Sequence, residues 1–215
     1  MSSPSATSIR NRLVSEFLGA RLLENNLRGY WCEAMVAEAL GPECRIVSGG
    51  WHAWDLQIGP DEATFPQRLR IQVKNSARLQ TWNAESGKLS ETTFQLTYRR
   101  RPAYFARDFP GVPCEEVGFM CDLFILCHHP IEDPKLADHR DPRQWEFFIL
   151  PVVGANPAVT ASETAYVKRI VEETGKPSST HRRPRTLVQG IRGRPRISPV
   201  RIDELTPDLL WRAVK

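Results

Sequence analysis

The sequence has no long apolar run, and this absence is the first constraint on its class. No stretch approaches the roughly 20 apolar residues that span a bilayer. The polar start MSSPSATSIRNR lacks the apolar segment of a secretory signal. Internal repeats and long low-complexity segments are missing too. We therefore expect a protein without a membrane partner that stays in the cytosol.

Paired cysteine motifs are also absent. The five cysteines form an odd set with no CxxC pair, which favours reduced thiols over a disulfide scaffold. Cys121, Cys127, His128 and His129 are metal-ligating residue types, but they lack the paired spacing of a zinc site, so buried strand thiols are the better interpretation. The chain shows no Ser/His/Asp arrangement and no glycine-rich phosphate loop.

Charge is unevenly distributed along the chain. The 215 residues are 41% hydrophobic and 25% charged, the composition of an ordinary globular protein. The net charge is +4, but residues 181–215 hold nine Lys and Arg against three Asp and Glu, a net charge of +6, so the first 180 residues carry −2. This C-terminal segment is the expected place of contact with a polyanion, although a solvated tail would have the same composition.

Four segments have the capping signals and periodicity of helices. Ser8 can cap a first helix that runs to about Glu24, and a second over Arg28–Leu40 stops at Gly41-Pro42. The second helix is apolar on nearly all sides, which predicts burial between other elements. A capping box begins a third helix over 162–173, and a Thr-Pro pair begins a last one at DLLWRAV.

Strand-like runs lie between these helices. Three short runs predict an antiparallel meander: Cys44–Ser48, Trp54–Ile58 and Arg68–Lys74. A fourth, Thr93–Arg99, alternates as a strand does but has no defined place in the sheet. Two continuous apolar runs, Gly118–Cys127 and Gln144–Pro151, are typical of strands in the middle of a sheet. The polar loop between them, which includes His139, is expected to be solvated.

Together these elements predict an α/β (α+β) fold in which helices flank a mixed central sheet. Residues 1–175 are expected to form the domain, including its N-terminal helix. Residues 176–215 are expected to form a basic C-terminal extension that ends in the short last helix.

Polar and apolar residues alternate strictly in the run 68–74. Successive side chains of a strand point to opposite faces, so Gln72 and Lys74 share one face and the apolar residues share the other. This face is one half of a candidate site.

The run 54–58 alternates as well, which places Asp55 and Gln57 together, opposite Trp54 and the two other apolar residues. A hairpin with a central turn would set Asp55 opposite Gln72 and Gln57 opposite Arg70, and a two-residue shift would preserve the faces. A carboxylate, an amide and an ammonium group would then share one patch at a sheet edge.

Oxygen ligands are those that a hard cation such as Mg²⁺ prefers. The Asp55 carboxylate, the Gln72 side-chain oxygen and the Val73 carbonyl could hold Mg²⁺, with Mn²⁺ as a substitute. Lys74 beside it would orient a nucleophile or stabilise negative charge in the transition state. The predicted chemistry is phosphodiester hydrolysis.

Asp55, followed seventeen residues later by Gln72-x-Lys74 in IQVK, resembles the D...(D/E/Q)-x-K signature of the PD-(D/E)XK nuclease superfamily. In that family the signature lies on a β-hairpin after a helix that carries a glutamate. RGYWCEAMVAEALG resembles this helix and implies a metal-binding and catalytic role for Glu33, in preference to Glu38.

The likeness covers residues 28–151 and is nearest to the Holliday-junction-resolvase-like and small homing or restriction endonucleases. It implies a restriction-endonuclease-like fold and a metal-dependent DNA endonuclease. A homodimer agrees with it, because many relatives cut DNA as dimers.

The chain departs from the family pattern at two positions. Gln72 stands where most members have an acid, and Trp54 stands where they have the proline before the aspartate. Three alternatives therefore stay open. The chain could be a nuclease-like module that binds nucleic acid without cutting it, or a subunit of a larger defence or mobile-element complex. The run 68–74 could also be a plain amphipathic strand.

Basic residues are the expected contacts with DNA, and RNA is not excluded as partner. The candidates are Arg70, Arg78, Arg99, Arg100, Arg192, Arg194 and Arg196. The segment 192–196 resembles the RGRP core of an AT-hook, whose arginines enter an A·T minor groove. The nearby apolar residues Ile191, Ile197, Val200 and Ile202 indicate instead that the segment packs on the domain, which leaves nonspecific phosphate contact.

Overall fold

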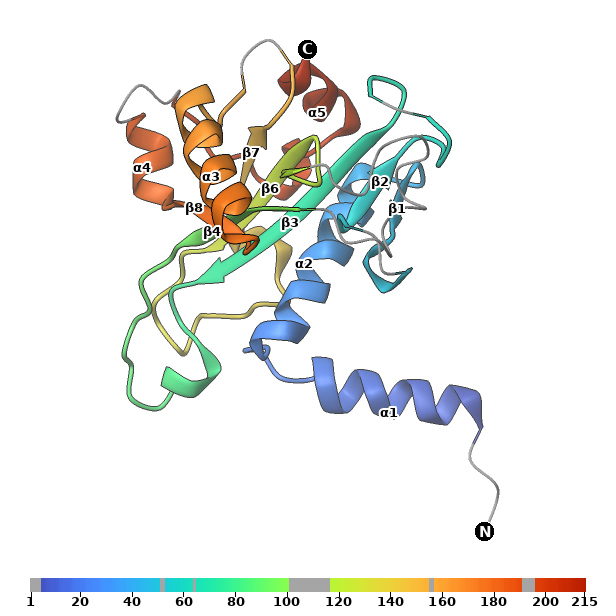
Figure 1. Cartoon of the computed structure of the whole chain (residues 1–215). Coiled ribbons are helices and arrows are strands. Elements are labelled where there is room, and N and C mark those ends of the chain that lie inside the picture. The colour runs from blue at the N-terminus through green and yellow to red at the C-terminus, as the bar shows by residue number, and fades with distance from the viewer. Residues whose placement is uncertain (1–4, 51–52, 64, 101–116, 155–156, 191–195) are drawn as a thin grey trace.

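The computed structural model is a mixed α/β structure with two sheets (Figure 1). It describes residues 5–50, 53–63, 65–100, 117–154, 157–190 and 196–215. Its α-helices are α1 (Ala6–Leu18), α2 (Asn25–Leu40), α3 (Ala161–Thr174), α4 (Pro184–Gln189) and α5 (Pro207–Val214). Short 3-10 turns are η1 (Ser48–Gly50), η2 (Thr81–Asn83), η4 (Pro142–Gln144) and η5 (Ile202–Glu204). No helix in the described ranges is long and apolar enough to cross a membrane.

A five-stranded mixed sheet forms the centre of the fold, which confirms the predicted class. Its strands, in spatial order, are β1 (Cys44–Ile46), β2 (Leu56–Ile58), β3 (Leu69–Ala77), β6 (Leu123–His129) and β7 (Glu146–Pro151). β1, β2 and β3 form the expected antiparallel meander. β3 and β6 are parallel, and β6 and β7 are antiparallel.

The prediction that both apolar runs lie in the middle of the sheet is half wrong. β6 is internal, but β7 is the last strand of the sheet, and among the described residues its other side pairs only through a bridge between Phe147 and Val200.

A second sheet of three strands lies beside the first. It consists of β5 (Val117–Gly118), β4 (Phe94–Arg100) and β8 (Ser178–Arg182), in that spatial order. β4 is the predicted alternating strand, and its Phe94, Leu96 and Tyr98 are buried as the alternation requires. The apolar run from Gly118 to Cys127 is divided between the sheets rather than forming one strand. The chain bends at residues 120–122 before β6 begins.

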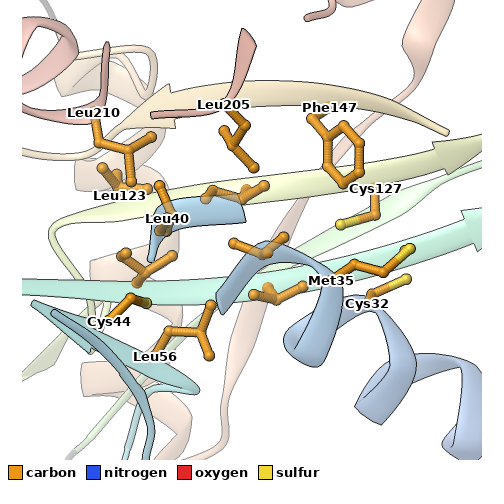
Figure 2. Packing of buried hydrophobic residues seen from close by; sticks show 14 of the residues in the cluster. Cys32, Met35, Leu40, Cys44, Leu56, Leu123, Cys127, Phe147, Leu205 and Leu210 are labelled. Atoms are coloured by element: carbon orange, nitrogen blue, oxygen red, sulfur yellow. The ribbon is translucent and has the colours of Figure 1, made fainter. Parts of the chain in front are cut away.

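The central sheet has an apolar core on each face. On one face α2 packs through Cys32, Met35 and Leu40 against the strands, and Leu205 and Leu210 from the C-terminal segment complete the cluster (Figure 2). The other core contains Trp54 and Phe124 with residues of β4, β7 and α4. Burial on both faces explains why every residue of β6 is buried.

The helix boundaries correct one prediction and confirm others. The first helix begins three residues earlier than expected, because Ser5 rather than Ser8 caps it, and it ends at Leu18, well before Glu24. α2 ends where predicted, and Gly41 adopts a φ of +82°, which a side chain would disfavour. Thr160 and Glu163 form the expected capping box of α3, and the Thr206 hydroxyl caps α5.

The segment after residue 175 takes part in both cores. β8 pairs with β4 over five residues. Leu210 and Val214 of α5 are buried in the first core, against which Val200 and Ile202 also pack. Ile197 packs on the second core. The prediction that this part of the chain packs on the domain is therefore confirmed for these residues, while Ile191 lies outside the described residues.

The loop between β6 and β7 is buried at His139, contrary to the expectation that it is solvated. The His139 Nδ1 accepts the Leu23 backbone N–H at 3.0 Å, and its ring packs against His129 and Trp145. Burial lowers the pKa of His139 to about 3. The loop composition alone could not show that this residue is covered by the segment between α1 and α2.

A buried ion pair joins β3 to the bend before β6. The Asp122 carboxylate accepts the Arg70 backbone N–H at 2.7 Å and pairs with the Arg70 guanidinium at 2.5 Å. The Asp122 backbone N–H donates to the Arg70 carbonyl at 2.9 Å. Because the Asp122 side chain is almost completely buried, its charge depends on Arg70 for compensation.

Replacing Asp122 with alanine is expected to lower the free energy of unfolding by about 3–5 kcal/mol, because it leaves a largely buried guanidinium without its counter-ion. Urea denaturation followed by circular dichroism would measure this. The control is Glu172→Ala, which removes one exposed partner of the Lys168–Glu172 pair on α3 and is expected to cost about 0.5 kcal/mol or less. If the two variants lost the same free energy of unfolding, Asp122 would not be the stabilising counter-ion of Arg70.

Candidate active site

Asp55 is fixed by backbone hydrogen bonds just before β2. Its N–H donates to the Ile71 carbonyl at 3.0 Å, and its carbonyl accepts from the N–H groups of Val47 and Ser48. In the same ladder Gln57 pairs with Arg70. The predicted pairing of Gln57 with Arg70 is therefore confirmed, while Asp55 lies just before the regular ladder, beside Ile71 and Gln72.

The Asp55 carboxylate is bound by β3. Its Oδ2 accepts the Val73 backbone N–H at 2.8 Å and also accepts the Gln72 side-chain amide. Gln72 therefore presents its side-chain nitrogen to the carboxylate, because its side-chain oxygen is an acceptor and would be repelled by the carboxylate oxygen. The predicted arrangement, in which the Asp55 and Gln72 oxygens act together as ligands, differs from this one. A half-turn of the Gln72 amide relates the two arrangements.

A small polar pocket of about 190 Å³ brings together the three residues of the sequence signature. Asp55, Gln72 and Lys74 line it, on the face of β3 that the alternation predicted. The remaining walls come from other parts of the fold: Ala53, Thr97 of β4, Met120, Cys121 and Phe124 of β6. Local sequence patterns carry no signal for these walls, because they are set by how β4 and β6 pack around β3.

Glu33 approaches this site from α2 without lining the pocket. Its carboxylate is half-buried and accepts the Ser48 hydroxyl at 2.7 Å. The pKa of Glu33 is raised to about 7, chiefly by burial and also by the negative charge of Asp55, while the Ser48 hydrogen bond and the Lys74 charge act in the opposite direction. The two carboxyl groups and the Lys74 ammonium are thus close enough to influence one another electrostatically.

The two glutamates of α2 are separated by the fold. Glu38 is exposed and lines a different hollow, between α2 and η5. Glu33 is therefore the glutamate of α2 that is electrostatically coupled to Asp55 and Lys74.

The oxygen atoms near Asp55 fit a hard divalent cation in type. Within a strand the N–H and C=O of one residue point to the same edge, so the Val73 carbonyl faces the edge where its N–H meets Asp55. The Asp55 carboxylate and this carbonyl are oxygen donors, and Glu33 adds a carboxyl group at the flank. In the part of the chain that the structure describes, no group of three or more His, Cys, Asp or Glu side chains gathers as a metal site.

The prediction that Trp54 shares a face with Leu56 and Ile58 is wrong. Trp54 is buried in the core opposite to that of Leu56 and Ile58, and its indole N–H donates to the Gln57 side-chain oxygen at 3.2 Å. The alternation fails here because regular strand β2 begins only at Leu56.

The predicted nucleic-acid contacts differ in availability. Arg70 is paired with Asp122, as described above, and also lies over the Trp54 ring. Arg78 pairs with Glu132 at 2.9 Å and is partly exposed, and Arg196 is exposed. Arg192 and Arg194 lie outside the described residues, as do the side chains of Arg99 and Arg100.

Comparison of the chain with protein-family models, with curated proteins and with solved structures finds no match.

The Glu33 carboxyl group is expected to titrate near pH 7, which NMR of ¹³C-labelled glutamate would measure. Asp55→Asn should lower this pKa because it removes a negative neighbour, and Ser48→Ala should raise it because the hydroxyl stabilises the ionised form. The pKa lies above the value of 4.5 of an unperturbed glutamate, so the protonated group contributes stability below about pH 4.5 that is lost as the pH rises through 7. If the pKa of Glu33 were the same in Asp55→Asn as in the wild type, the two carboxyl groups would not be electrostatically coupled.

Proposed function

We propose that this protein is a metal-dependent endonuclease that hydrolyses DNA phosphodiester bonds at the Asp55 pocket. One observation carries the proposal. A carboxylate held by a backbone N–H and an amide lies in the same small polar pocket as a lysine. This agrees with the PD-(D/E)XK resemblance of the sequence, in which Asp55, Gln72 and Lys74 are the signature residues.

Mg²⁺ is the proposed cofactor, and Mn²⁺ a substitute. Asp55 and the Val73 carbonyl would hold it, with Glu33 at the flank and the Gln72 oxygen after rotation of its amide. When bound, such a cation lowers the pKa of a water molecule and offsets charge on the phosphate. It would also draw the Glu33 carboxyl group toward its ionised form, because a nearby positive charge lowers the pKa of an acid.

Lys74 has the role of a fixed positive charge in this proposal. Its ammonium group would donate hydrogen bonds to the attacking water and to a phosphate oxygen, and so stabilise negative charge that grows in the transition state. Gln72 would orient the Asp55 carboxylate through the hydrogen bond already described.

DNA is the proposed substrate, and the same chemistry would serve RNA. Among the predicted contacts whose side chains the structure describes, Arg78 and Arg196 are more exposed than Arg70 and more available to a phosphate. The cytosol is the proposed compartment, since Cys32, Cys44, Cys121 and Cys127 are all free and buried.

Cleavage of supercoiled, linear, single-stranded and branched DNA with Mg²⁺, Mn²⁺ or chelator tests the proposal. Lys74→Ala is expected to lower the rate by about 100-fold or more, the usual effect of removing a fixed transition-state stabiliser. Asp55→Ala should abolish cleavage, because it removes the central carboxylate. Lys88→Ala is the matched control, since Lys88 is exposed and does not line the pocket. Metal-dependent cleavage that survives in both pocket variants would refute the assignment.

A second candidate is a nucleic-acid-binding module that does not cut. It is favoured by Gln72, which leaves Asp55 as the only carboxylate among the residues that line the pocket. Such a module would bind DNA without cleaving it in any divalent ion, and its melting temperature would not respond to these ions.

Gln72→Glu separates the two candidates. Without metal it should lower the melting temperature at neutral pH, because a second carboxylate would face Asp55 Oδ2. For an active metalloenzyme we expect Mn²⁺ to raise the melting temperature of the wild type and to raise that of Gln72→Glu by more, since ligand binding stabilises the folded state. Gln95→Glu, on the exposed side of β4, is the control. A rise confined to Gln72→Glu would favour the binding module.

A further inference from the structure

Helix α1 has an apolar stripe that the described chain does not cover. Ile9, Leu13 and Phe17 recur every four residues and therefore lie on one face, with Val14 beside them. Their exposed fractions are 51%, 52%, 53% and, for Val14, 53%, and the helix has no buried residue. In Figure 1 α1 extends away from the body of the protein. A short isolated helix gains little stability from propensity alone, so a partner surface is needed.

The connection between α1 and α2 is anchored on the body of the protein. Gly19, just after the helix, keeps a helical backbone with φ −73° and ψ −29°, and its carbonyl accepts the Arg140 guanidinium at 2.6 Å. The Arg21 carbonyl accepts the His139 N–H at 2.7 Å, and Leu23 is buried. The connection from α1 to α2 is thus held on the 138–140 loop, and α1 leaves from a fixed point.

An apolar groove of about 560 Å³ lies along the exposed side of α2. Trp31, Ala34 and Met35 of α2 form one wall, and Ile202 and Leu205 form the other. Two acidic residues, Glu38 and Asp203, also line it. We call this the α2–η5 groove.

Charge on α1 is opposite to charge on the α2–η5 groove. Arg10 and Arg12 lie on α1, where Arg12 has a weak exposed pair with Glu16 at 4.0 Å and Arg10 has no ion pair in the described structure. Glu38 and Asp203 likewise have no ion pair among the described residues. An apolar stripe with arginine beside it would meet an apolar groove with acids at its rim.

We propose that two copies of this chain form a symmetric dimer by exchanging α1, so that the apolar stripe of each copy lies in the α2–η5 groove of the other. The contact is a helix in a groove, a recurring mode of recognition. A two-fold axis makes two such contacts, which brings the buried area toward the roughly 1,600 Å² of a stable interface. A reciprocal exchange also closes, and so ends at the dimer. The proposal is independent of the chemistry at Asp55.

Analytical ultracentrifugation of the full chain over a wide concentration range tests the exchange. The wild type is expected to sediment as a dimer at high concentration. Leu13→Glu on α1 and Ala34→Arg in the groove should each raise the dimer dissociation constant by at least about tenfold, equivalent to 1.4 kcal/mol. Both residues are exposed in the single chain, so circular dichroism and the melting temperature of the diluted protein should stay unchanged. Tyr30→Glu, exposed on α2 but outside the groove, is the control.

The two substitutions separate the alternatives. If α1 paired with α1 of the other copy, Ala34→Arg would leave the dimer intact, and this result would overturn the proposal. A wild type that is monomeric at every concentration would also overturn it and would leave another protein as the occupant. Combining Arg10→Glu with Glu38→Arg should restore part of the affinity that each loses alone, since the charges are exchanged across the same contact.

Discussion

The pairing of β3 with β2 on one side and with β6 on the other decides where each candidate functional group lies. The antiparallel ladder fixes Asp55 against Ile71 and so delivers its carboxylate to the N–H of Val73. The parallel ladder, reinforced by Asp122 and Arg70, sets the residues before β6 against the opposite side of β3. A change of register by one residue in either ladder would turn Lys74 or its neighbours to the other face.

The buried charged groups of the protein are compensated to different degrees and by different partners. Asp122 has a full counter-ion. The Arg28 guanidinium, which is almost completely buried, donates instead to the amide oxygens of Asn25, Asn75 and Gln80, and so ties α2 to β3. Among the described residues, Glu33 has only the Ser48 hydrogen bond and the charge of Lys74 to stabilise its ionised form, and burial therefore raises its pKa. A carboxyl group that is poorly compensated beside a second one is the kind of group that a bound cation would relieve.

Helix α2 contributes to two distinct surfaces because adjacent residues of a helix point in directions about 100° apart. Glu33 turns toward Ser48 and the edge of the pocket, whereas Ala34 turns toward the α2–η5 groove. A copy docked in that groove would therefore contact the same helix that carries Glu33. The buried side of the helix, with Cys32 and Met35, holds both surfaces in a fixed relation to the sheet (Figure 2).

The sequence by itself determined the properties that depend on neighbouring residues. Strict alternation determined the faces of β3, a central turn predicted the pairing of Gln57 with Arg70, and a capping box indicated the start of α3. Only the tertiary structure decided that Thr97 and Cys121 line the pocket, that Gln72 turns its nitrogen to Asp55, and that His139 is buried. Periodicity reports the direction of a side chain relative to its own backbone. It does not report which distant element covers that side chain, and burial, pocket walls and hydrogen-bond partners all depend on that element.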